Sequence, residues 1–420
     1  MGNYRTLITG FLGLALLSLA CTSQALTLTA KQEKHLAQAR QEMGLGPDDM
    51  LKRHICLWDL SGRSGPIFNG ATNLRLDLLR YKIDISLEAF TNEGAMVASL
   101  KNGQCDAALM SGFRARQFNR FSGTIDAIGA LPSLKHMDML LRSIALPQLS
   151  ENMVSNKYQT LAVTPAGAAY LFVNDKRLNS LERVAGKKIA VLDFDPGQSK
   201  MVAQIGATPV ATTLATAPNQ FNNGSVDVLP APLVAYQVLE LYKGMEPDGG
   251  IVDYPIVQLT AQLIGHTDRF PPAFAAVIRE VAADSFSSIQ NALEKEAGQI
   301  PATWWIDVDH HEKQEYDSMM RAARLKLRET GYYDATMLKA DAVTSSLASR
   351  PATPAGQPAT HRSRLSQWVF NLKRRLPVQT INAHGGLRDF FSPTAHSPPA
   401  ARRPHRPRRQ PTKSDAGTTS

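Results

Sequence analysis

The chain has 420 residues, 43% of them hydrophobic, so it is long enough for two or three domains with apolar cores. Its formal net charge is +9, yet residues 351–420 hold 12 Lys and Arg against 2 Asp and Glu, which leaves about −1 for residues 1–350. The basic character belongs to a tail, so the charge does not indicate that the body binds nucleic acid.

The first 25 residues predict a secretory signal. Arg5 supplies a positive charge, residues 7–20 form an apolar run too short to cross a bilayer comfortably, and SQA at 23–25 fits a cleavage site. Lipoprotein processing at Cys21 is the alternative, although the usual leucine three positions earlier is missing. No later stretch is apolar and long enough to span a membrane. We therefore expect a periplasmic mature protein without stable membrane insertion.

Residues 27–112 predict a helix followed by a strand–helix–strand–helix–strand unit. The first helix lies within residues 27–50 and ends at Gly44 and Gly46. The predicted strands are HICLWDL (54–60), IDISLEAF (83–90) and CDAALMSG (105–112), with helices at 67–81 and 91–102 between them. This alternation is typical of a parallel sheet with right-handed crossovers.

The segment after this unit is less regular. FRARQFNRFSGTIDAIGALPS, residues 113–133, predicts a basic loop that leaves the strand in an extended conformation. Residues 133–157 predict a helical connection to a second unit. Residues 160–175 predict two strands, separated at 165–167 by Pro and Gly.

Residues 181–233 predict a second unit of the same kind. Its strands are KKIAVL (187–192), ATPVATT (207–213) and SVDVL (225–229), and its second helix is APNQFNNG (217–224). The first helix has Asp195 at its N-cap, Pro196 at the first helical position and Gly206 at its end. We predict a second parallel sheet from this pattern.

The remaining sequence predicts a return strand and helices. GGIVDYPIVQLTAQLIGH, residues 249–266, leads back toward the first unit, and residues 271–300 and 309–330 predict long amphipathic helices, the second opened by Asp307 and Asp309. From residue 344 the composition is rich in Pro, Ser, Thr and Arg, which predicts a disordered basic tail. Within it, SQWVFNLKRRL either forms a short helix that touches a membrane surface or has no role.

Both units resemble the two lobes of the DctP-like solute-binding proteins of TRAP transporters. The second unit carries "aGKKIAV", "iGATPV" and "fNNGSVDVLPAPL" in the family's order and spacing, and the first matches at Leu100, Gly103, Asp106 and Leu131-Pro132. Around SGFRARQFNRFSG and the cysteine-bearing strands, the chain resembles a divergent, AdeT-like branch whose members are described as associated with RND efflux.

The resemblance implies an α/β, two-lobed periplasmic binding protein fold, in which each lobe is a mainly parallel sheet flanked by helices and a hinge joins the lobes. The first lobe is expected in residues 26–150, the second in 151–249, and a return to the first in 250–343, before the tail at 344–420. The implied function is capture of a small polar solute for inner-membrane transporter subunits. The alternative is an accessory component of an envelope efflux system that uses the fold without delivering a solute.

Candidate ligand-binding residues follow the predicted strands, because open α/β sheets bind ligands at the carboxyl ends of their strands. They are Trp58, Ser61, Arg63, Ser111, Arg114, Arg116 and Asp193. Alternation in an extended segment would place Arg114 and Arg116 on one side, where guanidinium groups suit a carboxylate or phosphate. The competing interpretations are a core aromatic for Trp58, a solvated basic loop for the arginines and a solvated loop acid for Asp193.

One position departs from the family pattern. The family usually reads "GKKIRV", with an arginine that clamps the ligand's carboxylate, whereas this chain has Ala190 there, and the following polar turn is replaced by apolar residues at 229–232. Either the arginines of the first lobe supply the clamp, or the ligand is not a plain organic acid. Arginines facing Asp193 would suit a zwitterion or an amine-bearing ligand.

Two further groups of residues have chemical potential. Cys56 and Cys105 remain after removal of the signal, and they form either a disulfide, if their strands are neighbours, or two buried small apolar residues. The cluster from Asp307 to Glu312 contains His310 and His311, which point about 100° apart on a helix and are poor joint metal ligands. GxSxG, P-loop and HExxH motifs are absent. We expect no catalytic site, metal or cofactor.

Overall fold

The computed structural model describes residues 26–339, which belong to one compact unit. The predicted signal, the lipoprotein alternative at Cys21 and the basic tail lie outside the described residues. None of the helices within residues 26–339 combines the length and the apolar character that a membrane span requires.

The first predicted unit is confirmed, and its strands form the sheet of a first lobe. The central strand β1 pairs in parallel with β2 and with β3. The strands and crossover helices are β1 (Leu51–Trp58), α2 (Pro66–Leu79), β2 (Ile83–Phe90), α3 (Glu93–Lys101) and β3 (Ala107–Ser111). The preceding helix α1 (Ala30–Glu42) begins with a capping box, in which the Thr29 side chain accepts a hydrogen bond from the backbone of Gln32.

The second predicted unit is also confirmed. Its strand β6 pairs in parallel with β7 and β8, and its elements are β6 (Lys188–Leu192), α8 (Pro196–Gln204), β7 (Thr208–Thr212), α9 (Ala217–Asn222) and β8 (Val228–Pro232). Asp195 caps α8 as predicted, because its carboxylate accepts a hydrogen bond from the Gln198 N–H at 3.0 Å. Residues 229–232, expected as a turn, are instead part of β8, since they pair with a neighbouring strand throughout.

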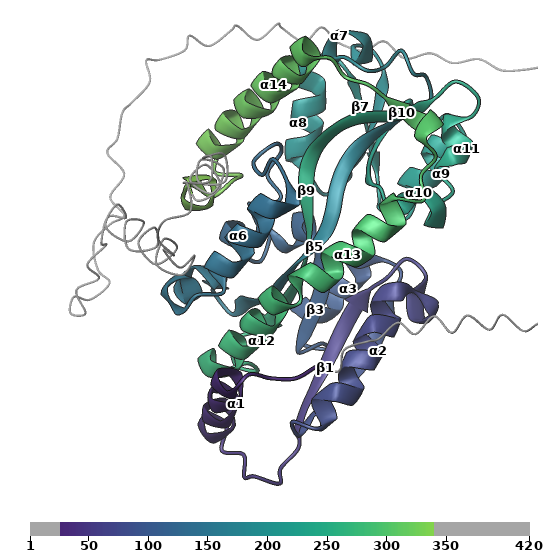
Figure 1. The fold of residues 1–420 in the computed structure, drawn as a ribbon. Helices are drawn as coiled ribbons and strands as arrows, with labels where there is room; N and C mark the ends of the chain where they lie inside the picture. Colours follow the sequence, from purple (N-terminus) through teal and green to yellow (C-terminus); the bar gives the residue numbers. More distant parts are fainter. Residues whose placement is uncertain (1–25, 340–420) are drawn as a thin grey trace, which may run out of the picture. The chain divides into compact units, whose positions relative to one another are not determined.

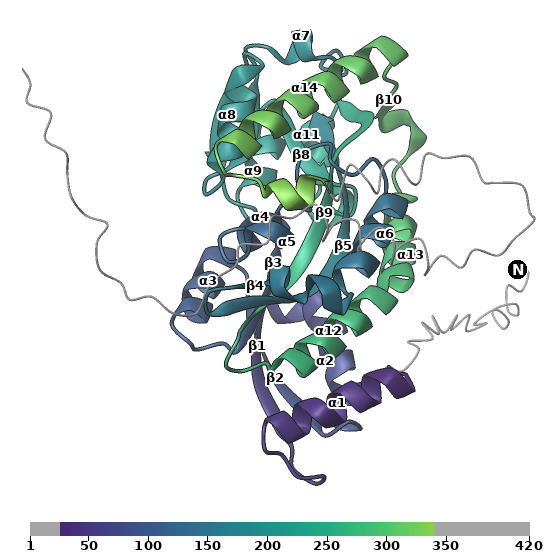
Figure 2. The same cartoon turned by 90° about the vertical axis from the view of Figure 1, so that its left-hand side faces the viewer.

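Two long antiparallel strands join the lobes. β5 (Tyr158–Val173) and β9 (Gly250–His266) run side by side from one lobe to the other (Figure 1, Figure 2). The sheet order is β2-β1-β3-β9-β5-β8-β6-β7, with β4 (Val154–Ser155) on β5 and β10 (Trp305–Ile306) on β9. The lobe boundaries expected at residues 150 and 249 stay a prediction, because both strands extend into each lobe.

The prediction of two strands in residues 160–175 was wrong. The chain forms the single strand β5, and its pairing with β9 shifts register between Pro165 and Ala168. Gly167 lies at the shift with a φ of +89°, a conformation that favours glycine. A bulge therefore takes up the Pro-to-Gly interruption without ending the strand.

The segment after β3 is helical rather than extended, which corrects the expected geometry of Arg114 and Arg116. It contains α4 (Gly112–Ala115), α5 (Arg120–Gly123), α6 (Leu134–Ile144) and the 3₁₀ helix η2 (Pro147–Met153). Ser111 caps α4, because its hydroxyl accepts a hydrogen bond from the Arg114 N–H. Residues two positions apart on a helical turn point in nearly opposite directions, so the two arginines diverge.

The C-terminal helices cover both lobes. They are α12 (Pro272–Asp284), α13 (Phe286–Ala297) and α14 (His310–Glu329), which begins at a capping box of Asp309 and Glu312. Phe274 of α12 packs in a cluster with Leu57 of β1, while Tyr316 of α14 packs with Ile189 of β6. The other short helices are η1 (Gly62–Ser64), α7 (Leu181–Val184), α10 (Ala235–Val238), α11 (Tyr242–Met245) and η3 (Ala302–Trp304), and residues 335–339 are also helical.

Candidate solute-binding cleft between the lobes

A cleft of about 280 Å³ lies where the carboxyl ends of the strands in the two lobes face each other. The first lobe contributes the last residue of β1 and residues that follow β2 and β3, and the second contributes residues that follow β6 and β7. The lining consists of Trp58, Thr91, Asn92, Glu93, Gly94, Arg114, Asp193, Phe194, Thr213, Leu214 and Ala215. This is the edge at which open α/β sheets bind ligands.

Arg114 connects the two lobes across this cleft. Its Nε lies 3.4 Å from a carboxylate oxygen of Glu93, and its guanidinium carbon lies 3.2 Å from the centre of the Phe194 ring in the second lobe. The side chain of Arg114 is 17% exposed and that of Glu93 is 4% exposed. The positive charge is thus held between a buried carboxylate and an aromatic face.

Glu93 is held firmly by the backbone of the first lobe. As the first residue of α3, it accepts a hydrogen bond from the Ser111 N–H at 2.6 Å, at the end of β3. Burial raises the pKa of Glu93, although the hydrogen bond from Ser111 and the charge of Arg114 act in the opposite direction. Displacing Arg114 would leave this carboxyl buried without its cation.

Asp193 stands on the opposite wall and is exposed. Its backbone N–H donates a hydrogen bond to the Thr212 carbonyl at 2.8 Å, which fixes the loop after β6 to the end of β7. Its carboxylate has no hydrogen-bond or ion-pair partner among residues 26–339. The cleft lining therefore holds one cationic side chain and two carboxylates, and Asp193 is the carboxylate that remains open to a ligand.

The structure places six of the seven predicted ligand-binding residues in three groups. Trp58, Arg114 and Asp193 line the cleft together. Ser111 lies behind the lining, where it caps α4 and donates its N–H to Glu93. The exposed side chains of Ser61 and Arg63 lie in and next to the 3₁₀ helix after β1 and are not part of the lining.

Arg116, the seventh, is buried in an interlobe network instead. Its Nη1 lies 3.4 Å from a carboxylate oxygen of Asp195, the N-cap of α8, and donates a hydrogen bond to the Tyr332 hydroxyl, which itself donates to Asp195. Its Nε donates to the Gly123 carbonyl at 3.0 Å. The side chains of Arg116 and Asp195 are 7% and 3% exposed, so this ion pair ties the lobes together away from solvent.

Ala190 lies away from the cleft. It is 5% exposed and packs in an apolar cluster with Phe221 of α9 and Leu229 of β8. In this chain the position is part of the core of the second lobe, and a cationic side chain there would be surrounded by apolar groups.

Several lining residues were not singled out from the sequence. Glu93 follows β2, Phe194 follows β6, and Thr213, Leu214 and Ala215 follow β7. The signal that could have found them is the rule used for the other candidates, applied to the second strand of each unit and to every residue that follows β6. The partnership of Glu93 with Arg114 had no such signal, because it depends on how α3 and α4 pack.

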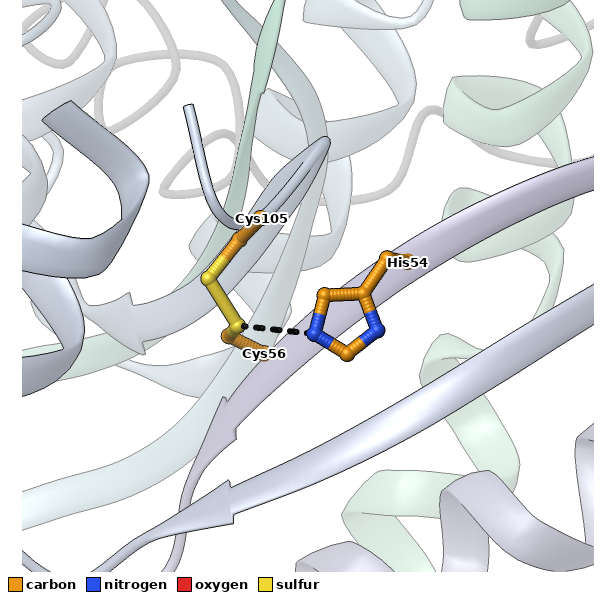
Figure 3. A group of neighbouring side chains, drawn as sticks. All are labelled: His54, Cys56 and Cys105. Atoms are coloured by element: carbon orange, nitrogen blue, oxygen red, sulfur yellow. Dashed lines mark hydrogen bonds between the residues drawn. A yellow bond between two sulfur atoms is a disulfide. The ribbon is translucent and has the colours of Figure 1, made fainter. Parts of the chain in front are cut away.

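The disulfide between Cys56 and Cys105 is confirmed. Both residues are fully buried, and their Cα atoms are 5.8 Å apart because β1 and β3 are neighbours. His54 lies beside the bond, with Nε2 3.8 Å from the sulfur of Cys56 (Figure 3). The same Nε2 lies 3.1 Å from a carboxylate oxygen of Glu88. The sulfurs are bonded to each other, so this group of His and Cys acts as a structural link behind Trp58, which packs against the same cluster.

Asp126 is a buried carboxyl that contacts one of the linking strands. It is buried against the middle of β9, where it accepts hydrogen bonds from the Thr260 N–H at 3.0 Å and the Thr260 hydroxyl at 2.5 Å. A Cβ at Gly112 would overlap both side chains, so glycine is required at the start of α4. Burial raises the pKa of Asp126 from its ordinary value of 3.8 to about 7, and the hydrogen bonds from Thr260 oppose that shift.

We expect the Asp126→Asn variant to flatten the pH dependence of stability. Between about pH 4 and 7, folded Asp126 holds a proton that the unfolded chain releases, so the free energy of unfolding falls as pH rises. A neutral amide removes this contribution, and the slope should become shallower by about 1.4 kcal/mol per pH unit. Urea unfolding at each pH from 4 to 8 measures it, with exposed Asp268→Asn as the control. Parallel curves for Asp126→Asn and the wild type would contradict the assignment.

Comparisons with known proteins agree with this geometry. A family model described as "Solute-binding protein AdeT 1/2" matches residues 71–344. Probable solute-binding protein AdeT1 of Acinetobacter baumannii is 37% identical over 282 residues, which cover 67% of this chain and 93% of that protein. Probable solute-binding protein AdeT2 of the same organism is 28% identical over 213 residues, 51% of this chain and 90% of that protein.

Solved structures share the fold at low identity. A TRAP periplasmic solute-binding protein from Desulfovibrio salexigens, with bound orotic acid, has a TM-score of 0.59 at 13% identity and covers 70% of this chain and 98% of its own. A TRAP periplasmic solute-binding protein from Shewanella oneidensis, with bound succinate, has a TM-score of 0.55 at 11% identity. The match covers 70% of this chain and 99% of that protein's chain. These likenesses show the two-lobed α/β fold.

Proposed function

Because the chain belongs to the solute-binding protein AdeT 1/2 family, we propose that it captures a small polar solute in the cleft between its lobes. In this proposal the protein acts in the periplasm, performs no chemistry on the solute and delivers it to a membrane transporter. The observation that carries the proposal is the cleft itself, which is lined from both lobes by residues at strand ends.

The linking strands support a closing motion. β5 and β9 join the lobes, and their pairing is irregular between Pro165 and Ala168, where fewer backbone contacts resist bending. Hinge closure around a ligand is the common motion of two-lobed binding proteins. A solute that contacts Trp58 on one wall and Asp193 on the other would favour the closed arrangement.

The size of the cleft favours a small solute. A volume of about 280 Å³ is just below the usual range of ligand sites, which measure about 300–1,000 Å³. The solved relatives named above were bound to orotic acid and succinate, both acids. In this chain the cationic group of the cleft, Arg114, is already paired with Glu93, so the chemistry of its solute needs separate argument.

We expect a cognate solute to raise the midpoint of thermal unfolding, and Ala215→Trp to abolish that rise. A solute at about 100 times its Kd stabilises the folded protein by about 2.7 kcal/mol. Ala215 is an exposed lining residue, so an indole there should fill the cleft without disturbing the core. Ala203→Trp, at an exposed position of α8 that is not part of the lining, is the matched control and should keep the response.

Two results would count against the proposal. A response that survives in Ala215→Trp would place the solute elsewhere. If no small molecule stabilises the protein, an accessory role in an envelope efflux system, without solute delivery, becomes the better interpretation.

A further inference from the structure

The charges that line the cleft are unequal. Glu93 and Asp193 are acidic and Arg114 is basic, and the other lining residues are uncharged. Arg114 already pairs with Glu93, because its Nε lies 3.4 Å from a carboxylate oxygen of that residue. Its guanidinium carbon lies 3.2 Å from the centre of the Phe194 ring. What remains for a ligand is the exposed carboxylate of Asp193 on the facing wall.

A bare organic acid fits this arrangement poorly. At the Nε of Arg114 it would compete with Glu93, whose side chain is 4% exposed and would be left buried without its cation. At the Nη edge it would meet a guanidinium whose charge Glu93 already offsets. It would also bring a third negative charge into a small cleft that already holds Asp193. Like charges in a partly closed site repel each other more strongly than they do in water.

We propose that the solute of this protein carries a protonated amine, which pairs with Asp193 when the lobes close. This inference rests on the proposed solute-binding function and narrows it to a class of ligand. Trp58 and Leu214 supply apolar surface from the two lobes, so the amine is borne on a small body with an apolar face. A carboxylate on the same solute is tolerated where it reaches the free Nη edge of Arg114, which makes an amino acid acceptable.

Matched probes separate the charge of the solute from its shape. Phenethylamine, phenylalanine and 3-phenylpropionate share a phenyl ring and a short chain but carry a cation, a zwitterion and an anion. Putrescine and succinate repeat the contrast without the ring. Isothermal titration calorimetry of the full chain with each of the five measures Kd, and we expect the amine-bearing probes to bind at least 10-fold more tightly than their acid counterparts.

The Asp193→Asn variant tests the proposed partner. The variant removes the negative charge that pairs with the amine. Loss of such a charged hydrogen bond should weaken amine binding by roughly 10- to 100-fold. Asp48→Asn is the matched control, because the Asp48 side chain is 98% exposed and is not part of the lining, and its Kd should be unchanged. Unchanged thermal unfolding of Asp193→Asn verifies that the variant is folded.

The results separate a failure of the amine inference from a failure of the proposed solute-binding function. If 3-phenylpropionate or succinate binds most tightly, or if Asp193→Asn binds amines as well as the wild type, the amine inference is overturned while solute binding stands. If none of the five probes binds, the amine inference is contradicted, and the thermal-unfolding test with Ala215→Trp decides separately whether the cleft binds a solute. If phenylalanine binds more tightly than phenethylamine, the inference holds and Arg114 contributes a carboxylate contact.

Discussion

Replacing both Cys56 and Cys105 with alanine is expected to lower the free energy of unfolding by about 4 kcal/mol. The bond closes a loop with a sequence separation of 49 residues, and the chain-entropy estimate for a loop of this length is about 4 kcal/mol. Both sulfurs are fully buried, so the lost packing adds to the cost. Equilibrium urea unfolding of the oxidised wild type and the double variant measures the difference.

The denaturant slope provides a second observable. Without the cross-link the unfolded chain should be less compact, and the m-value should rise in the variant. Wild-type protein unfolded in the presence of a dithiol reductant is the control, since it lacks the bond but keeps both side chains. A loss below about 1 kcal/mol in both experiments would contradict a stabilising role for the bond, because a native disulfide typically contributes 2–5 kcal/mol.

Arg116→Met should destabilise the fold by about 3–5 kcal/mol, because it leaves Asp195 buried beside Tyr332 without a cation. Adding Asp195→Asn should recover much of this loss, since asparagine also caps helices and carries no charge to bury. A double-mutant cycle of Arg116 and Asp195 therefore measures their coupling directly. Thermal and urea unfolding of the wild type, both single variants and the double variant complete the cycle.

The exposed pair of Arg142 and Asp138 on α6 serves as the reference. Their side chains are 42% and 30% exposed, and the pair has the i, i+4 spacing of a helix surface, so Arg142→Met should cost only about 0.3–0.5 kcal/mol. If the losses from Arg116→Met and Asp195→Asn simply add, the buried network is not cooperative. Arg116 would then stabilise the protein through its contacts with Gly123 and the aromatic rings.

The contrast between Arg114 and Arg116 shows where sequence reasoning failed. Their spacing predicts alternation in an extended segment, which would present both side chains to one ligand. Ser111 instead caps a helical turn, so one arginine lines the cleft and the other is buried against the second lobe. The helical turn is marked by a hydrogen bond from the Arg114 N–H to the Ser111 hydroxyl, which no periodicity over two residues reveals.

The elements that the sequence determined by itself are those with local causes. Asp195 and Asp309 cap helices through their own neighbours, and the strands of both units follow from apolar runs bounded by turns. Because the same local patterns predict where the strands end, they also point to the residues at those ends as candidates. Three of these candidates, Trp58, Arg114 and Asp193, line the cleft. Together with the family resemblance, this was enough for the fold and for part of the site.

Only the tertiary structure decided which of these residues meet. Glu93 pairs with Arg114, Arg116 with Asp195, and Cys56 with Cys105, across sequence separations of 21, 79 and 49 residues. These partnerships depend on the pairing of β5 with β9 and of β1 with β3, which brings distant strand ends to one edge. Side chains at such separations leave no periodic signal in a single sequence, so the charge that is open to a ligand could be identified only after the fold had paired the others.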